Sequence, residues 1–130
     1  MLKIIDTNYA LRYLIQDDYN LAVKAKEVLD EGVYILPESI VEIVYVLSKV
    51  YKTERRDIYF AITDLLQDVD MIDKQLYENA VKIYGNTKLD YVDCVLIARN
   101  KMFNDKIYTF DNRLNKVLYN NINLDKITFM

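Results

Sequence analysis

The chain opens on Leu2-Lys3-Ile4-Ile5-Asp6-Thr7-Asn8, in which a short apolar run ends at an acidic residue. An apolar run of this length, closed by polar residues, is typical of a buried strand, so we predict a strand at Leu2–Ile5. Asp6 follows directly at its carboxyl end. Similar apolar runs recur along the chain, so further strands can be predicted in the same way.

These further runs alternate with segments of helical periodicity, which is the pattern of βαβ units. We predict three more strands and a short edge strand, at Val33–Leu36, Val69–Ile72, Lys106–Thr109 and Lys126–Phe129. The helices expected between them are Tyr19–Glu31 after a cap at Asp17 or Asp18 and before Gly32, Glu38–Val50, one from Thr53 and Glu54 to Gln67, Lys74–Tyr84 after Asp73, Tyr91–Lys101 after Asp90, and a short one after Asp111 or Asn112. The sequence therefore predicts an α/β fold with a mostly parallel sheet flanked by helices.

With 130 residues, of which 52% are hydrophobic, the chain fits one compact domain, residues 1–130. Its apolar stretches fall well short of the roughly 20 residues of a membrane span. The N-terminal residues Met1–Asp6 lack the features of a signal peptide, and the single Cys94 permits no internal disulfide. We therefore expect a cytoplasmic protein that does not bind membranes.

Two absences limit the kinds of catalytic and binding site that the chain can form. The chain contains no histidine, which excludes Ser-His and Cys-His nucleophiles and His-ligated zinc. Only Gly32 and Gly85 occur, so neither a Walker loop nor a dinucleotide fingerprint can be formed. Reactive groups must then come from carboxylates, hydroxyls, amines or metal ions held by carboxylates.

The charge balance of 17 basic and 20 acidic residues gives a net charge of −3. This argues against binding nucleic acid mainly through a basic surface. Bound cations can reverse the sign locally, because they are then the largest charges in the site.

Glu42 is the first candidate for a metal ligand. It is the only charged residue in Ser39–Ser48, a helical stretch that is apolar nearly all round and is therefore expected to be buried. A buried carboxylate requires a cation or a hydrogen-bond donor. Arg12 or Arg99 could supply that partner in a salt bridge, as an alternative to a metal.

Four more acidic residues are candidates for the same site as Glu42. Asp6 and Asp111 are predicted at the carboxyl ends of parallel strands, where ligands of open sheets bind, and Asp90 and Asp93 share one face of a helix. Each also has a structural alternative: Asp6 and Asp111 as helix caps, and Asp90 with Asp93 as an acidic capping box.

Carboxylates gathered within about 4 Å repel by roughly 4 kcal/mol per pair, which divalent cations relieve. Ligation by oxygen alone selects Mg²⁺ or Mn²⁺. Such ions keep waters that can serve as the nucleophile, so the predicted reaction is hydrolysis of a phosphodiester bond.

Four motifs carry a resemblance to a known family. They resemble those of the PIN-domain nucleases, and more closely the VapC-type toxins of toxin–antitoxin pairs. In chain order the motifs are Asp6-Thr7-Asn8-Tyr9-Ala10-Leu11-Arg12-Tyr13-Leu14, Ser39-Ile40-Val41-Glu42-Ile43-Val44-Tyr45-Val46-Leu47, Leu89-Asp90-Tyr91-Val92-Asp93-Cys94-Val95-Leu96-Ile97-Ala98 and Tyr108-Thr109-Phe110-Asp111.

The resemblance implies a PIN-like three-layer sandwich whose parallel sheet has the order 3-2-1-4-5. It also implies an RNA substrate, often transfer RNA, a homodimer, and inhibition by a small protein antitoxin. The chain has Asn104-Asp105 where the family often has a glycine before its last strand. The implied metal ligands are Asp6, Glu42, Asp93 and Asp111, supported by Thr7 and Asp90.

A cluster of basic residues could guide the RNA backbone toward these acids, or could be an ordinary solvated turn. Its members are Lys49, Lys52, Arg55 and Arg56. Three rival functions remain open: an aspartyl-phosphate phosphatase, for which Asn8 stands where a second Asp is usual, a non-catalytic module that binds RNA or protein, and a PIN nuclease of RNA processing without a toxin role.

Overall fold

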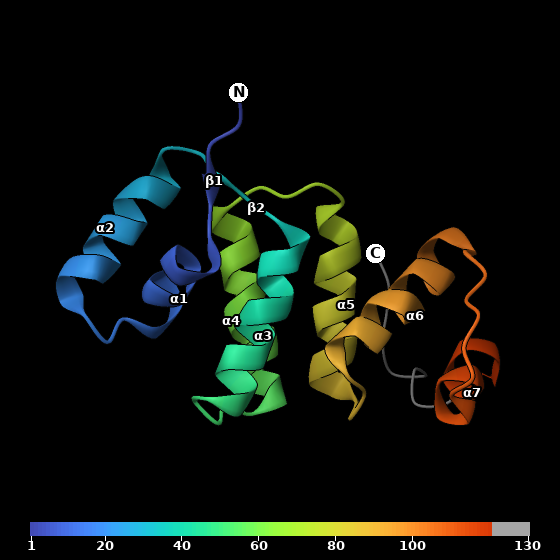
Figure 1. The fold of residues 1–130 in the computed structure, drawn as a ribbon. Helices are drawn as coiled ribbons and strands as arrows, with labels where there is room; N and C mark the ends of the chain where they lie inside the picture. Colours follow the sequence, from blue (N-terminus) through green and yellow to red (C-terminus); the bar gives the residue numbers. More distant parts are fainter. Residues whose placement is uncertain (121–130) are drawn as a thin grey trace.

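The computed structural model describes residues 1–120 and is mostly helical, with a small parallel sheet near the N-terminus (Figure 1). Seven helices and two strands make up this part of the chain. In order they are β1 (Ile4–Ile5), α1 (Thr7–Ile15), α2 (Tyr19–Asp30), β2 (Tyr34–Ile35), α3 (Pro37–Lys49), α4 (Arg55–Asp68), α5 (Lys74–Asn86), α6 (Tyr91–Phe103) and α7 (Asn112–Asn120).

The sheet contains β1 and β2 in parallel, with Ile4 opposite Tyr34 and Ile5 opposite Ile35. Tyr34 also forms a parallel bridge to Asp70. The third predicted strand is therefore formed as a single bridge beside β2. The order of these three segments agrees with the 3-2-1 part of the expected sheet.

The fourth predicted strand, at Lys106–Thr109, is not formed. A strand needs a neighbour for its backbone groups, and α3, α4 and α5 lie between this segment and β1 (Figure 1). The five-strand order is therefore not seen. The predicted strand at Lys126–Phe129 lies outside the described residues.

Local signals placed the helices correctly to within a few residues. Asp18 caps α2 by accepting a hydrogen bond from the backbone N–H of Leu21 at 3.1 Å. Gly32 follows the C-cap of α2 with φ of +83°, a conformation that glycine adopts at little cost. Asp73 and Asp90 precede α5 and α6 as expected, although neither side chain makes a capping hydrogen bond.

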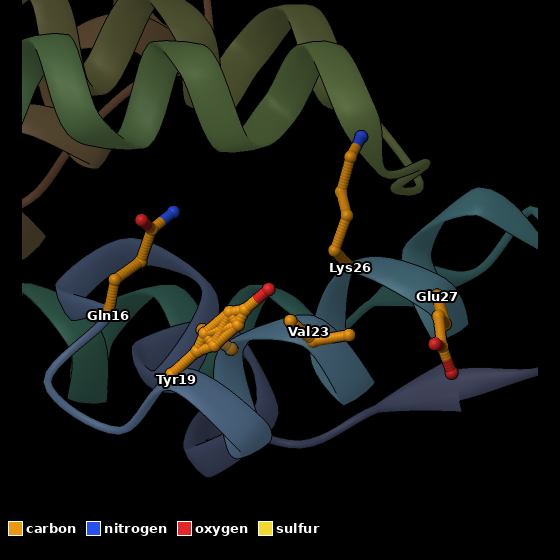
Figure 2. A pocket seen from close by; sticks show the side chains of 6 residues that line it. Gln16, Tyr19, Val23, Lys26 and Glu27 are labelled. Carbon is orange, nitrogen blue, oxygen red and sulfur yellow. The ribbon is translucent and has the colours of Figure 1, made fainter.

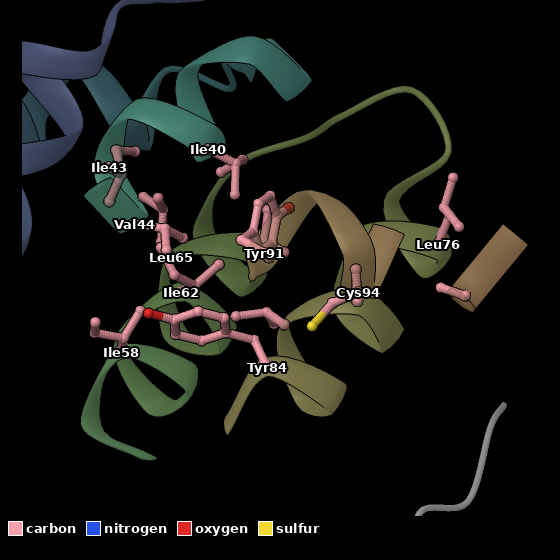
Figure 3. Close-up of a cluster of buried hydrophobic side chains, with 14 of the residues drawn as sticks. Ile40, Ile43, Val44, Ile58, Ile62, Leu65, Leu76, Tyr84, Tyr91 and Cys94 are labelled. Carbon is pink, nitrogen blue, oxygen red and sulfur yellow. The ribbon is translucent and has the colours of Figure 1, made fainter. Parts of the chain in front are cut away.

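The core lies where α3, α4, α5 and α6 meet, and Figure 3 shows its side chains interdigitating between these helices. Each helix contributes aliphatic side chains that are almost fully buried. Examples are Ile40 and Ile43 from α3, Ile58, Ile62 and Leu65 from α4, Leu76 and Ile83 from α5, and Ile97 from α6.

The helices on the two sides of this core are separated in space. β1, α1 and α2 lie on one side of α3–α5, whereas α6 and α7 lie on the other (Figure 1). None of the helices within residues 1–120 is long and apolar enough to cross a membrane.

Candidate functional site

Asp6 lies at the carboxyl end of β1, as predicted, and its side chain is exposed. One carboxylate oxygen, Oδ1, accepts a hydrogen bond from the backbone N–H of Tyr9 at 3.0 Å and so caps α1. The capping role considered for this residue is therefore confirmed. It leaves Oδ2 available for a cation, because a carboxylate has two acceptor oxygens. Thr7 follows as the first residue of α1 and is half-buried.

Glu42 is exposed on α3, so the prediction that its helix is buried nearly all round is wrong. Only one face of α3 packs into the core. The opposite face leaves Val41 and Tyr45 beside Glu42, 41% and 64% exposed respectively. Apolar composition alone cannot report how many neighbours surround a helix.

The proposed salt bridges to Glu42 are not formed either. Arg12 pairs with Asp17, with 2.9 Å between Nη1 and Oδ1. Arg99 pairs with Asp105, with 2.6 Å between Nε and Oδ2. Within residues 1–120, neither arginine that was considered is therefore engaged with the Glu42 carboxylate, which remains exposed to solvent or to a ligand.

Asp93 is half-buried in the first turn of α6, and its pKa is raised. Partial desolvation contributes most to the shift, followed by the charges of Asp90 and then Asp111, while Arg113 lowers the pKa. The structure thus brings two of the predicted acids, Asp90 and Asp111, into electrostatic range of Asp93. A cation bound among them would relieve their repulsion.

Asp111 is exposed and caps α7, so its structural alternative is also confirmed. Its Oδ1 accepts hydrogen bonds from the backbone N–H groups of Arg113 at 2.8 Å and Leu114 at 3.2 Å. Its own N–H donates to Oγ1 of Thr109 at 3.1 Å. The carboxylate is held in place by the backbone while Oδ2 stays available.

Arg113 is the charged neighbour that the sequence analysis missed. It is exposed in the first turn of α7, and its positive charge lowers the pKa of Asp93 on α6. The available signal was its position two residues after Asp111, which was predicted to follow a strand. Such a residue shares a helix terminus with the acid, and its positive charge can contact a phosphate bound to a metal ion that the carboxylates hold.

The acids do not form one complete metal site in this arrangement. Within residues 1–120, no group of three or more His, Cys, Asp and Glu side chains is placed to hold a metal ion. Asp93 and Asp111 lie within electrostatic range of each other at the start of α6 and α7. Asp6 caps α1, and Glu42 lies on α3, which contacts both α1 and α6.

The four residues of the basic cluster differ in their burial and in their contacts. Arg55 is half-buried: its Nε donates to the carbonyl oxygen of Tyr84 at 3.0 Å, its Nη2 donates to that of Leu89, and the guanidinium lies 3.8 Å from the Tyr84 ring centroid. Arg56 donates to Oδ1 of Asn86 at 2.8 Å. Lys49, Lys52 and Arg56 are exposed, and the contact of this cluster with RNA stays a prediction.

A surface cavity of about 360 Å³ lies between the end of α1 and α2 (Figure 2). Gln16, Tyr19 and Lys26 extend to the same side of it, while Glu27 points away. None of the predicted metal ligands lines this cavity, so we assign it no part in catalysis.

Comparison with known proteins supports the same interpretation of the chain. One curated relative, named VapC ribonuclease, from Aquifex aeolicus (strain VF5), is 26% identical over 94% of this chain and 96% of its own length. No solved structure matched the chain. A family model described as the PIN domain matches residues 3–118, which include all four predicted metal ligands. The chain therefore belongs to the PIN-domain family.

Proposed function

We propose that this protein is a divalent-metal-dependent endoribonuclease that hydrolyses phosphodiester bonds in RNA and acts as the toxin of a toxin–antitoxin pair. The observation that carries the proposal is the PIN-domain match over residues 3–118. The VapC ribonuclease relative supports it over nearly the full length of both chains.

The ligands of the proposed metal site are Asp6, Glu42, Asp93 and Asp111, with Thr7 and Asp90 in support. All are oxygen donors, which suits Mg²⁺ or Mn²⁺ better than zinc or copper. Burial raises the pKa of Asp93 most, and the charges of Asp90 and Asp111 add to the shift, so a bound cation would stabilise the ionised carboxylate. Bound there, the ion would supply Lewis-acid activation of water and charge neutralisation at the phosphate.

The side chains themselves have roles that follow from their contacts. The caps at α1 and α7 fix one oxygen each of Asp6 and Asp111, so the remaining oxygens are held in a defined direction. Arg113 is exposed beside the α6–α7 acids and is proposed to pair with a phosphate oxygen of the substrate. Lys49 and Lys52 are proposed to contact the RNA backbone farther along.

For the four acids to bind one ion, the α6–α7 end must come next to β1. The expected sheet order 3-2-1-4-5 describes such an approach, with Lys106–Thr109 added beside β1. Asp111 would then follow its strand at the same edge of the sheet where Asp6 follows β1. We propose that the active protein has this pairing.

An antitoxin partner is proposed from the apolar surface that borders Glu42. Val41 and Tyr45 are 41% and 64% exposed on the same helix as this acid. An inhibitor that covered them would also block the carboxylate. Exposed apolar side chains that flank a polar site are typical of a surface that binds another protein.

The direct test is RNA cleavage by the purified protein, free of any partner, with Mg²⁺ or Mn²⁺ and with the metal removed by a chelator. We expect cleavage only with metal. The variant Asp93→Asn should be inactive, whereas Asp57→Asn, which removes an exposed acid from the first turn of α4, should be as active as wild type.

Two results would contradict the proposal. Absence of cleavage with every divalent metal would remove the enzymatic assignment and, if RNA still bound, would favour the non-catalytic module. Trapping of a phosphorylated Asp6 would favour the phosphatase instead. Transfer RNA is the first substrate to try, and sequencing of the product ends would identify the cleavage site.

A further inference from the structure

α6 begins without a side-chain cap of its own. Asp90 is its N-cap residue, but the Asp90 side chain makes no capping hydrogen bond, unlike those of Asp6 and Asp18, which cap α1 and α2. The first turn of α6 carries Asp93, a proposed metal ligand. A helix end leaves backbone groups without partners and frays unless other contacts hold it. The direction of the Asp93 side chain must therefore be set by contacts from other parts of the chain.

Arg55 supplies such contacts from the start of α4. Its Nη2 donates a hydrogen bond to the carbonyl oxygen of Leu89, the residue directly before Asp90. Its Nε donates to the carbonyl oxygen of Tyr84, near the end of α5, at 3.0 Å. The donors of a guanidinium lie in one rigid plane, so they fix two acceptors relative to each other. Arg55 therefore joins the end of α5 to the residue that precedes α6.

Two aromatic rings extend this link into α6 itself. Cζ of Arg55 lies 3.8 Å from the ring centroid of Tyr84. The Tyr84 ring meets that of Tyr91 edge-on, with 6.2 Å between the centroids and 74° between the planes. Tyr91 is the first residue of α6, and both tyrosines are buried in the core (Figure 3). Arg55, Tyr84 and Tyr91 thus form a continuous stack that ends at the start of α6.

Leu89 is the second point at which the start of α6 is held. Its N–H donates to Oγ1 of Thr87 at 3.4 Å, and its carbonyl oxygen accepts from Sγ of Cys94 at 3.8 Å as well as from Arg55. Cys94 directly follows Asp93 and is completely buried. The residues on both sides of Asp93 are therefore attached to a framework in which Arg55 is the central donor.

Arg55 does not act on these acids through its charge. None of the ion pairs within residues 1–120 includes it. Burial raises the pKa of Asp93 most, and the charges that add to or oppose this shift are those of Asp90, Asp111 and Arg113. The guanidinium is half-buried and is oriented by two carbonyl oxygens and a ring. Its effect on Asp93 is therefore transmitted by the backbone.

We propose that Arg55 is a positioning residue: by bridging the end of α5 and the residue before α6, it fixes the first turn of α6 and the direction of the Asp93 carboxylate. This inference rests on the proposed nuclease function, in which Asp93 holds a metal ion. It replaces the prediction that Arg55 contacts the RNA backbone. Because Arg55 holds the helix end, the carboxylate of Asp90 is not needed as a cap and keeps both oxygens for the site.

The first experiment measures amide hydrogen exchange, residue by residue, in the metal-free protein. The N–H of Cys94 donates to the carbonyl oxygen of Asp90 at 3.0 Å, the hydrogen bond that opens α6. Arg55→Lys should speed exchange at Cys94 by about tenfold, the effect of one lost hydrogen bond. Arg55→Met keeps the aliphatic stem but loses every donor, so its effect should be at least as large.

The matched control is Leu66→Ala. Leu66 is a buried residue of α4 that lies about three turns beyond Arg55, so its truncation lowers overall stability without altering a contact of Arg55. Exchange should rise throughout the core of this variant, with no preference for the first turn of α6. Comparison of the two patterns separates a local loss of order from a general loss of stability.

The second experiment separates positioning from RNA binding. Arg55→Lys keeps the positive charge, so the KM for RNA should stay within about twofold of wild type. The kcat should fall by about 10–100-fold, because a displacement of about 1 Å at a catalytic group can cost up to 100-fold. Mn²⁺ binding, measured by calorimetry without RNA, should weaken by about tenfold. Leu66→Ala should keep the wild-type kcat and Mn²⁺ affinity at a temperature at which it is fully folded.

Two results would overturn the proposal. The first is a raised KM with an unchanged kcat in Arg55→Lys and Arg55→Met, which would show that Arg55 binds RNA directly. The second is unchanged exchange at Cys94 in both variants. If wild type binds Mn²⁺ but cleaves no RNA, the nuclease proposal fails, while exchange at Cys94 and Mn²⁺ affinity still test whether Arg55 positions Asp93.

Discussion

Asp93 in the first turn of α6 and Asp111 ahead of α7 lie close enough for their carboxylates to repel each other. Partial burial is the larger cause of the raised pKa of Asp93, and the charges of Asp90 and Asp111 add to it. An acid kept in such surroundings weakens the folded protein whenever it is ionised. Residues of this kind are typical of functional sites, where stability is lost in exchange for activity.

The first prediction follows from this conflict between the stability of the fold and the charge of Asp93. Asp93→Asn should lower RNA cleavage by at least about 100-fold, because even changes outside the ligand set of a metal cost up to that factor. The same change should raise the melting temperature of the metal-free protein at neutral pH, since it removes a partly buried charge. Thermal unfolding at several pH values, together with cleavage assays, measures both effects.

The sign of the pH dependence is fixed by the direction of the shift. The folded pKa of Asp93 is raised above the ordinary value of 3.8, so its ionisation destabilises the fold as pH rises through the folded pKa. The advantage of Asp93→Asn should therefore be present at neutral pH and vanish below about 3.8. A variant less stable than wild type at pH 7 would contradict this interpretation of Asp93.

The second prediction concerns the contact between α1 and α4. The Tyr13 hydroxyl donates a hydrogen bond to the Asp68 carboxylate. That hydrogen bond, with burial and the charge of Asp68, raises the pKa of Tyr13 to about 12. Its stabilising contribution is complete below the ordinary pKa of 10.0 and is lost as pH rises through about 12.

Tyr13→Phe should therefore lower the free energy of unfolding by about 1 kcal/mol at pH 7. The difference from wild type should shrink between pH 10 and pH 12, the two pKa values that bound the window. Urea unfolding across this range is the measurement. An unchanged difference at pH 12 would show that the hydroxyl acts through packing and not through its proton.

The helices could be predicted from the sequence because the signals that begin and end them are local. Asp18 and Gly32 bound α2 through contacts within a few residues of each end. The exposure of Glu42 could not be predicted this way, because it depends on which elements pack around α3. The same limit applies to Lys106–Thr109, whose strand character depends on a neighbour that the sequence does not specify.

For the candidate site too, the sequence predicted some features and not others. The sequence analysis proposed the acids from their type and position, and the structure brings Asp90 and Asp111 into electrostatic range of Asp93. It did not predict that, within residues 1–120, the acids would not be gathered into one group able to hold a metal ion. Whether these acids meet is set by how the α6–α7 end packs against the rest of the chain, which composition and spacing do not encode.

The third prediction tests the role of Arg55. Its guanidinium links two backbone carbonyls and the ring of Tyr84, so Arg55→Ala should lower the free energy of unfolding by about 2 kcal/mol. Arg55→Lys should not restore it, because an ammonium cannot reach both carbonyls and stack on the ring. The control Arg56→Ala, with one exposed hydrogen bond, should change stability by less than about 0.5 kcal/mol. Chemical unfolding of the three proteins shows which of the two arginines stabilises the fold.

The fourth prediction concerns the close approach of α4 and α5 at Gly85. A Cβ added there would lie 2.5 Å from the Cβ of Tyr59, an atom fixed directly to the α4 backbone. Gly85→Ala gains about 1 kcal/mol of helix propensity, but separating the helices costs about 1–3 kcal/mol. The net effect should be a loss of stability, together with poorer packing of Tyr59.

Gly32→Ala provides the contrast. No atom lies within 4 Å of the position that its Cβ would occupy, but its φ of +83° is unfavourable for alanine. Its loss should be about 1 kcal/mol and purely conformational, so it should leave the tyrosine environment unchanged. Near-ultraviolet circular dichroism together with urea unfolding separates the two cases. If Gly85→Ala were more stable than wild type, α4 and α5 would have to be farther apart at Tyr59 than the structure places them.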